Sequence, residues 1–285
     1  CFWHVQHEFI LAEQTVLERA ASELTAVSGY AGGTRLNPDG KACYYDYGGN
    51  GHTEVVELLI PRDSVASFAA VFWSLFVGKN RIDTMDIGPS YRAAVGLPGG
   101  ISSPLLAVVN SSQEGHVAQP FQLLEGHGMD RDTLGEALVW VYDSDHFPFH
   151  QAELYHQFHD DFMPGGNYPD HYNKVLKKAV LEACRMLPTN CPADVAQPPD
   201  GCSVEGGSSQ TSSDDDPDTG GTLGGGSGGS GGSGTWRVNE DTSQDQRSTS
   251  SGNEVSTSSG AGSFKLSSVL FELWIWLFVP TLGLS

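Results

Sequence analysis

The sequence CFWHVQHEFILAEQTVLERAA, residues 1–21, is the stretch on which the predicted fold depends. Its apolar residues recur near helical spacing and polar residues fill the other face, so it predicts a helix from Phe2 to about Ala21. Cys1 then begins that helix, where free N–H groups and the helix dipole favour thiolate over thiol. Two interpretations are open: a nucleophile beside an aromatic pocket formed by Phe2 and Trp3, or a buried cysteine that serves packing.

Composition divides the chain into three parts. Residues 1–202 carry most of the aromatic residues and predict one globular domain. Residues 203–263 are almost wholly small and polar, which predicts a disordered linker. Residues 264–285 form an apolar tail that is short for a spanning helix and lacks following basic residues, so we expect a GPI-like signal or another membrane attachment. The expected location is at a membrane, with the cell surface favoured and an organelle or the cytosol as the alternative.

Charge and cysteine usage narrow the function classes. The net charge of −20 argues against nucleic-acid binding by phosphate neutralisation, and it fits a soluble particle that we expect to be a monomer. No two cysteines form a CxxC pair, and their odd number leaves one thiol unpaired in any intramolecular scheme. The cysteines are Cys1, Cys43, Cys184, Cys191 and Cys202.

The other periodic segments alternate between strand and helix. Strands are predicted at residues 53–60, 92–95, 105–109 and 137–142, with Pro61 ending the first. Helices are predicted at residues 64–76, 152–162 and 173–186. This alternation within one domain predicts an α/β or α+β two-layer sandwich.

Four further motifs accompany the initial Cys-Phe-Trp in chain order. They are GYAGG at 29–33, GHTEVV at 51–56, DIGPSYR at 86–92 and PFHQAELYHQFH at 148–159. In this order they resemble the A-type peptide methionine sulfoxide reductases, whose pattern is GCFWG, GYxGG, an NP turn, GHxE, DxGxxYR and PFxxAExYHQ. The resemblance covers about residues 1–162. It implies a ferredoxin-like mixed sheet with helices, whose first strand would precede Cys1 and is missing from this sequence.

Reduction of a sulfoxide needs a soft nucleophile for the sulfur and an acid for the oxygen. A thiolate supplies the first, and Glu54, in a predicted strand where burial would raise its pKa, supplies the second. The resemblance implies that Cys1 is the nucleophile, Glu54 the acid, and Asp86 and Tyr91 the polar side of the pocket. Aromatic side chains hold the S-methyl group by apolar and sulfur–aromatic contact. The predicted pocket residues are Phe2, Trp3, Tyr44 and Tyr45.

The expected cycle passes through a Cys1 sulfenic acid that a second thiol converts to a disulfide, which a thioredoxin-like dithiol reductant reopens. No metal and no resident cofactor is expected, and the substrate is oxidised methionine in proteins, in peptides or as the free amino acid. Cys191 is favoured as the resolving cysteine, then Cys202, while Cys184 lies in a predicted helix. A structural disulfide between Cys191 and Cys202 is the alternative.

This sequence departs from the family pattern at one catalytic position. The tyrosine that follows the NP turn in the family has no counterpart, and Tyr44, Tyr45 or Tyr47 is the candidate to replace it. Two other functions compete with reduction. One is a surface-tethered domain that keeps the fold without turnover. The other is a metallohydrolase whose ligands would come from His146, His150, His156, His159, Asp160 and Asp161.

Overall fold

The computed structural model describes residues 1–82, 85–161, 165–192, 194, 197–202 and 272–278. The predicted linker at 203–263 lies outside these residues, as does most of the apolar tail. The described residues form a mixed α/β fold with three small, open sheets, and the short strand β9 (Glu272–Phe278) joins two of them. No helix in this described part is long and apolar enough to cross a bilayer.

The first sheet is antiparallel, and its central strand is the most apolar one. Strand β2 pairs with β1, and β1 pairs with β8. The bounds are β1 (Val27–Ala31), β2 (Thr53–Pro61) and β8 (His150–Gln151). Seven of the nine β2 residues are buried, which is typical of a strand that is covered on both faces.

The second sheet is parallel. Strand β7 lies between β6 and β5 and runs parallel to both. The bounds are β5 (Ala94–Leu97), β6 (Gln122–Glu125) and β7 (Leu138–Asp143). Strand β9 runs antiparallel to β2 on one side and to β5 on the other, so the full order is β6-β7-β5-β9-β2-β1-β8. The third sheet is the hairpin of β3 (Phe76–Val77) and β4 (Asn80–Arg81).

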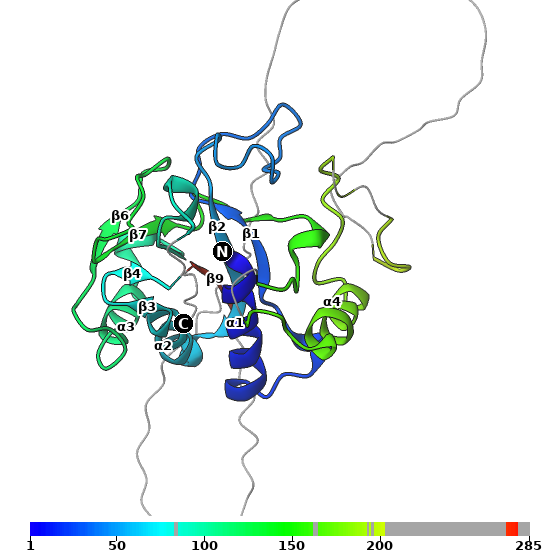
Figure 1. Cartoon of the computed structure of the whole chain (residues 1–285), viewed down its shortest axis with the longest axis horizontal. Coiled ribbons are helices and arrows are strands. Elements are labelled where there is room, and N and C mark those ends of the chain that lie inside the picture. Colours follow the sequence, from blue (N-terminus) through cyan, green and yellow to red (C-terminus); the bar gives the residue numbers. More distant parts are fainter. Residues whose placement is uncertain (83–84, 162–164, 193, 195–196, 203–271, 279–285) are drawn as a thin grey trace, which may run out of the picture. The chain divides into compact units, whose positions relative to one another are not determined.

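Helix α1 (Phe2–Val16) packs against β1, β2 and α2 (Val65–Ser74), with the N-terminus close to the start of β2 (Figure 1). Its buried face joins the core through the stacked rings of Phe9 and Phe68, whose centroids are 6.1 Å apart. Helix α3 (Leu106–Ser111) packs on α2, and the Trp73 indole N–H donates to the Val109 carbonyl at 2.8 Å. Helix α4 (Lys177–Glu182) continues the π-helical turn η6 (His171–Leu176).

Short 3-10 turns link these elements. They are η1 (Ala21–Glu23), η2 (Arg62–Ser64), η3 (Pro89–Tyr91), η4 (Gly100–Ser102) and η5 (Leu154–His156). The strands predicted near residues 53–60, 92–95 and 137–142 and the helix predicted at 64–76 are present within two residues at most boundaries. Helix α1 ends at Val16, short of the predicted Ala21, because Glu18 adopts a left-handed conformation with φ 53° and turns the chain back.

Two predicted elements are wrong. The predicted strand at 105–109 is helix α3, because so short an apolar run does not distinguish a strand from a buried helix. The helix predicted at 152–162 is reduced to the turn η5. There the Gln157 side chain bonds both backbone groups of Ser28, and Phe158, at φ 54°, donates its N–H to the Gln6 side chain. These long-range bonds replace the hydrogen bonds of a helix.

Candidate active site

Three chemically active atoms meet at the N-terminus of α1. The Cys1 sulfur, a Glu54 carboxyl oxygen and an Asp86 carboxyl oxygen all lie within 4.8 Å of one another. Glu54 comes from the second residue of β2, and Asp86 comes from the loop before η3. The Asp86 carboxylate also contacts the backbone nitrogen of Cys1, and the Phe2 N–H donates to Glu54 at 3.0 Å. The start of the helix thus orients both carboxyl groups beside the sulfur.

The Glu54 carboxyl group is buried, and its residue is 3% exposed. Burial raises its pKa to about 7, and the negative charge of Asp86 acts in the same direction. The Cys1 nitrogen and the hydrogen bonds from Phe2 and Tyr47 oppose this rise without cancelling it. Near neutral pH a large fraction of Glu54 therefore holds a proton and can deliver it to an oxygen atom beside Cys1.

The aromatic side of the site is built around the first turn of α1. Phe2 and Trp3 are 1% and 6% exposed, and both contact the imidazole of His156, with ring centroids 5.3 and 5.8 Å away. The His159 ring also stacks on the Trp3 indole, with ring centroids 4.3 Å apart. Burial lowers the pKa of His156 to about 4, so its ring is neutral at pH 7 and serves as an aromatic surface.

The tyrosine loop, residues 43–47, directs its three candidate tyrosines to three different surroundings. Tyr47 is buried, and its hydroxyl donates to Glu54 at 3.2 Å and is hydrogen-bonded to the Tyr91 hydroxyl. Burial raises the pKa of Tyr91 to about 12, so its hydroxyl stays protonated. Tyr44 is half-exposed and its ring lies 4.4 Å from His156, at the edge of the aromatic group. Tyr45 is 64% exposed and accepts a hydrogen bond from Asn37, away from Glu54.

Arg92 brings three of the motif segments together. The guanidinium group is fully buried and donates to the carbonyls of Gly32, Gly51 and Pro89 at 2.8, 2.9 and 2.8 Å. Gly32 has φ +74°, a backbone conformation that favours glycine. A single side chain thus joins the segments at 29–33, 51–56 and 86–92, which explains why their backbones converge on α1.

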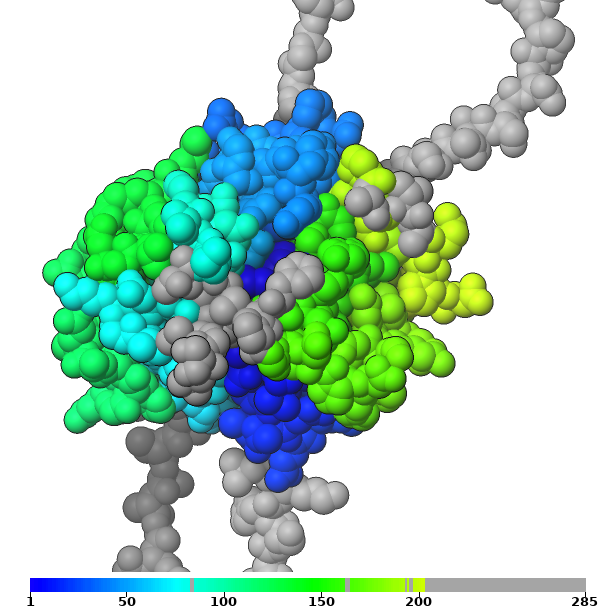
Figure 2. Space-filling model, in the orientation of Figure 1, coloured from blue at the N-terminus to red at the C-terminus, as the bar shows by residue number. Residues whose placement is uncertain are grey.

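The last motif segment is held to β1 and to the tyrosine loop by the side chain of Glu153. Glu153 accepts hydrogen bonds from the Tyr30 hydroxyl at 2.9 Å and from the Tyr44 N–H at 2.8 Å. Figure 2 shows the dark-blue N-terminal residues in a hollow between the blue segment before β2, the cyan segment before β5 and the green segment after β8. The first motif segment therefore lies in a hollow that three other parts of the chain surround.

Four of the five cysteines are paired, and Cys1 is the free one; all five lie in the described residues. Cys43 pairs with Cys191 and Cys184 pairs with Cys202, so the alternative disulfide between Cys191 and Cys202 is not formed. The Cys43 and Cys191 sulfurs lie within 4.8 Å of a Glu153 oxygen, which places this disulfide next to the tyrosine loop. Cys184–Cys202 lies beside the end of α4.

Metal-binding potential is confined to two places in the described part of the chain. One is the Cys1, Glu54 and Asp86 group, and the other is Cys43, Glu153 and Cys191, whose sulfurs are joined to each other. The histidines and aspartates considered as hydrolase ligands do not gather there. Two of them, His156 and His159, stack on Trp3 instead.

The sequence missed several residues that complete the site. Tyr47 was an open candidate without a role, while Tyr30, Arg92 and Glu153 lie inside the quoted motifs, so their positions were visible but their contacts were not. Arg81 and Asp132 gave no sequence signal. No protein-family model matches the chain, and comparison with curated proteins and with solved structures gives no significant match.

Proposed function

We propose that the protein reduces the S epimer of methionine sulfoxide to methionine, with Cys1 as the nucleophile. The observation that carries the proposal is the free Cys1 sulfur within 4.8 Å of Glu54, a carboxyl group whose pKa is about 7. A thiolate and a protonated acid side by side are what transfer of a sulfoxide oxygen requires.

In the first step Cys1 attacks the sulfoxide sulfur while Glu54 protonates the oxygen. The oxygen ends on Cys1 as a sulfenic acid and methionine leaves, so the sulfoxide is reduced by two electrons and Cys1 is oxidised by two. Tyr47 and Tyr91 donate hydrogen bonds on the polar side, and Phe2 and Trp3 bind the S-methyl group. Tyr47 takes the position of the tyrosine that the family has after its NP turn.

In the second step a thiol attacks the sulfenic acid, water leaves and a disulfide forms. An external dithiol of the thioredoxin type then reduces that disulfide and is itself oxidised. With the pairing seen here, Cys191 becomes available only after the Cys43–Cys191 disulfide is reduced, and the same holds for Cys184 and Cys202. Until then the external dithiol supplies the second thiol.

The proposal includes the ferredoxin-like arrangement and a membrane location. Helices α1 and α2 packed against each other beside β1 and β2 support the first. Two disulfides are typical of an oxidising compartment, which fits a location outside the cell and leaves the membrane attachment resting on the composition of the tail. Membrane attachment through the tail would use residues 272–278, which pair with β2 and β5 here, so the two arrangements exclude each other.

The test is an assay of purified protein with the two epimers of a methionine sulfoxide peptide and dithiothreitol. We expect consumption of the S epimer only, and no consumption by Cys1→Ser. Absence of turnover, or equal turnover by Cys1→Ser, overturns the proposal and favours the alternative of a domain that keeps the fold without catalysis.

A further inference from the structure

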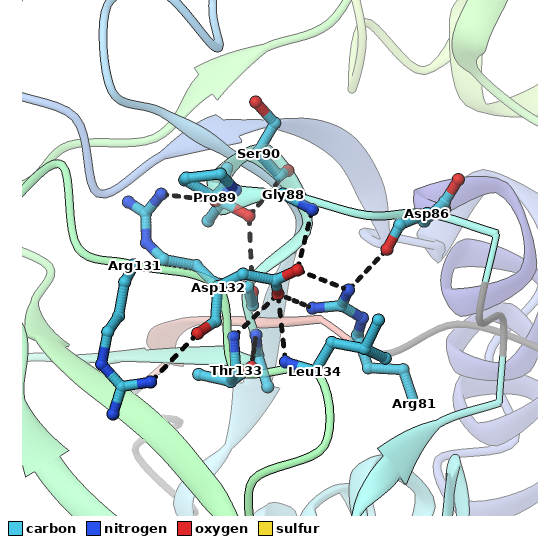
Figure 3. A network of polar contacts seen from close by, with 12 residues as sticks. Arg81, Asp86, Gly88, Pro89, Ser90, Arg131, Asp132, Thr133 and Leu134 are labelled. Atoms are coloured by element: carbon cyan, nitrogen blue, oxygen red, sulfur yellow. Dashed lines mark hydrogen bonds and ion pairs between the residues drawn. The ribbon is translucent and has the colours of Figure 1, made fainter.

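The segment His127–Gly135 contains two aspartates that reach the loops of the candidate site. Asp132 lies at the centre of a polar network between Arg81 and Gly88 (Figure 3). Asp130 accepts a hydrogen bond from the Tyr142 hydroxyl, which in turn accepts one from Arg92. No sequence motif assigns this segment a function, and nothing in the proposed chemistry uses it directly.

Arg81 and Asp132 both form hydrogen bonds to the backbone of the Asp86 loop, residues 85–88. Arg81, on β4, is 1% exposed and forms an ion pair with Asp132. The same guanidinium group donates to the backbone carbonyl of Asp86, and Asp132 accepts the Gly88 N–H at 2.7 Å. The residues on either side of Ile87 are therefore held by one partly buried ion pair.

Asp132 is itself fixed by its own segment. Its carboxylate accepts the N–H groups of Thr133 and Leu134 at 2.7 and 3.2 Å. Burial acts to raise the pKa of Asp132, but the hydrogen bonds from Arg81, Gly88 and Thr133 outweigh it and hold the pKa below its usual value. Asp132 therefore stays ionised and keeps its ion pair across the neutral pH range.

The Asp86 loop has little apolar packing that could replace these hydrogen bonds. Met85 and Ile87, the neighbours of Asp86 in sequence, are 78% and 69% exposed. The Asp86 carboxylate nevertheless lies within 4.8 Å of the Cys1 sulfur. Because displacement of a reacting group by about 1 Å can cost a hundredfold in rate, what fixes this loop matters for catalysis.

We propose that Arg81 and Asp132 are positioning residues, which set the Asp86 carboxylate beside Cys1 and Glu54. The inference rests on the proposed function for its meaning in catalysis. It assigns a role to a segment 40 or so residues beyond the site loop, and it predicts that this role is separable from folding stability.

The experiment compares Asp132→Asn with Glu136→Gln in the full chain. Both variants change a carboxylate to an amide, and Glu136 pairs with Arg131 at the exposed surface of the same part of the chain. For Asp132→Asn we expect kcat to fall by about tenfold or more with a smaller change in KM, because the chemistry and not apolar binding depends on Asp86. Glu136→Gln keeps both constants.

The pH profile separates positioning from stability. The groups that face Glu54 are the Cys1 and Phe2 nitrogens, the hydroxyls of Tyr47 and Tyr91, and Asp86. Of these, the Asp86 carboxylate raises the pKa of Glu54, so moving it away lowers that pKa. As the pH rises, the activity of Asp132→Asn should therefore begin to fall at a lower pH than the activity of the unchanged protein. Glu136→Gln should not shift the profile.

Each outcome decides the inference. If folded Asp132→Asn matches Glu136→Gln in kcat and pH profile, the positioning role is wrong, even where its melting temperature is lower. If Asp132→Asn does not fold, Arg81→Lys takes its place, because lysine keeps the charge but cannot bond both Asp132 and the Asp86 carbonyl as the guanidinium group does. Unchanged kinetics of this variant again overturn the inference.

Failure of the proposed function has a different signature. If the unchanged protein lacks reductase activity, that function is wrong, and the rate of Cys1 alkylation by iodoacetamide decides the positioning role. Withdrawal of a carboxylate from beside the sulfur should speed alkylation in Asp132→Asn about twofold or more relative to Glu136→Gln, because a thiolate is more stable without a neighbouring negative charge. Equal alkylation rates overturn the inference.

Discussion

The two ends of helix α1 each bury a glutamate, and the two sites differ in how completely the charge is compensated. At the C-terminal end, Glu13 is fully buried, pairs with Arg19 and accepts the N–H groups of Thr25 and Ala26 at 3.0 and 3.1 Å. At the N-terminal end, Glu54 receives two hydrogen bonds, from Phe2 and Tyr47, and has another carboxylate nearby.

This difference separates a carboxylate that serves the fold from the carboxyl group that the proposed function uses as an acid. The ion pair and hydrogen bonds at Glu13 compensate its desolvation, so that the charge holds the end of α1 against β1. In the described residues no lysine, arginine or histidine side chain forms an ion pair with Glu54, and burial raises its pKa to about 7. A buried carboxyl group that is undercompensated in this way is typical of catalytic sites.

The largest expected effect is the loss of the nucleophile. Cys1→Ser should abolish turnover, because a hydroxyl group at neutral pH does not attack a sulfoxide sulfur at a useful rate. The measurement is consumption of the S-epimer peptide with dithiothreitol. As a control, the double variant Cys184→Ser/Cys202→Ser removes the disulfide beside the end of α4 and should keep turnover with this reductant. A Cys1→Ser protein with normal activity would show that the site beside Glu54 does not carry out the reaction.

Glu54→Gln is expected to have the next largest effect, about a hundredfold to a thousandfold loss of kcat, since amides do not act as general acids. The unchanged protein should lose activity as the pH rises through about 7, where Glu54 loses its proton, and the variant should lack this limb. Rates measured from pH 5 to pH 9 test both statements. A variant that keeps the same alkaline limb would show that another group titrates there.

The same variant should also be more stable at alkaline pH. A carboxyl group whose pKa is raised on folding destabilises the fold as the pH rises from about 4.5 to about 7, and the full cost remains above that range. A shift from 4.5 to about 7 corresponds to a cost on the order of 3 kcal/mol. Urea unfolding at pH 8 should show part of this amount as a gain for Glu54→Gln, and no gain at pH 4.

Glu13→Gln should show the opposite combination. Removal of the charge leaves Arg19 without its partner and weakens the bonds to Thr25 and Ala26, so we expect a loss of about 2–3 kcal/mol in the free energy of unfolding, the upper part of the range for hydrogen bonds to a charged group. Because Glu13 lies at the other end of α1, kcat should stay within about twofold at temperatures below unfolding. A large fall in kcat with unchanged stability would show that Glu13 serves catalysis and not the fold.

The sequence predicted local elements, and the residues that meet beside Cys1, better than it predicted the contacts that support them. Periodicity predicted β2, α2 and β7. The order of the motifs, and not the local setting of either residue, predicted that Cys1 and Glu54 belong to one site, and the two side chains lie together in the structure. The short segments at 105–109 and 152–162 were misassigned, because contacts from Trp73 and Gln6, more than 30 residues away, decide their conformation.

The supporting contacts depend on spatial proximity that a single sequence does not encode locally. Asp132 lies 51 residues from Arg81, and five cysteines allow many pairings, of which Cys43–Cys191 joins residues 148 apart. The tyrosine loop shows the same limit. Three hydroxyl groups lay within four residues, and only the backbone path of the loop determines that Tyr47 faces Glu54 while Tyr45 faces Asn37.

That loop gives the smallest expected effect and the finest test of the comparison. Tyr47→Phe removes a donor to Glu54 and should lower kcat by about twofold to tenfold, the range expected for the loss of one neutral hydrogen bond. Because the Tyr47 hydrogen bond lowers the pKa of Glu54, its removal raises that pKa, and the alkaline limb should move to higher pH. The matched control is Tyr45→Phe, which removes the same atom from an exposed tyrosine and should change neither value. If both variants behave alike, Glu54 is not tuned by this loop, and burial with Asp86 alone must account for its protonation.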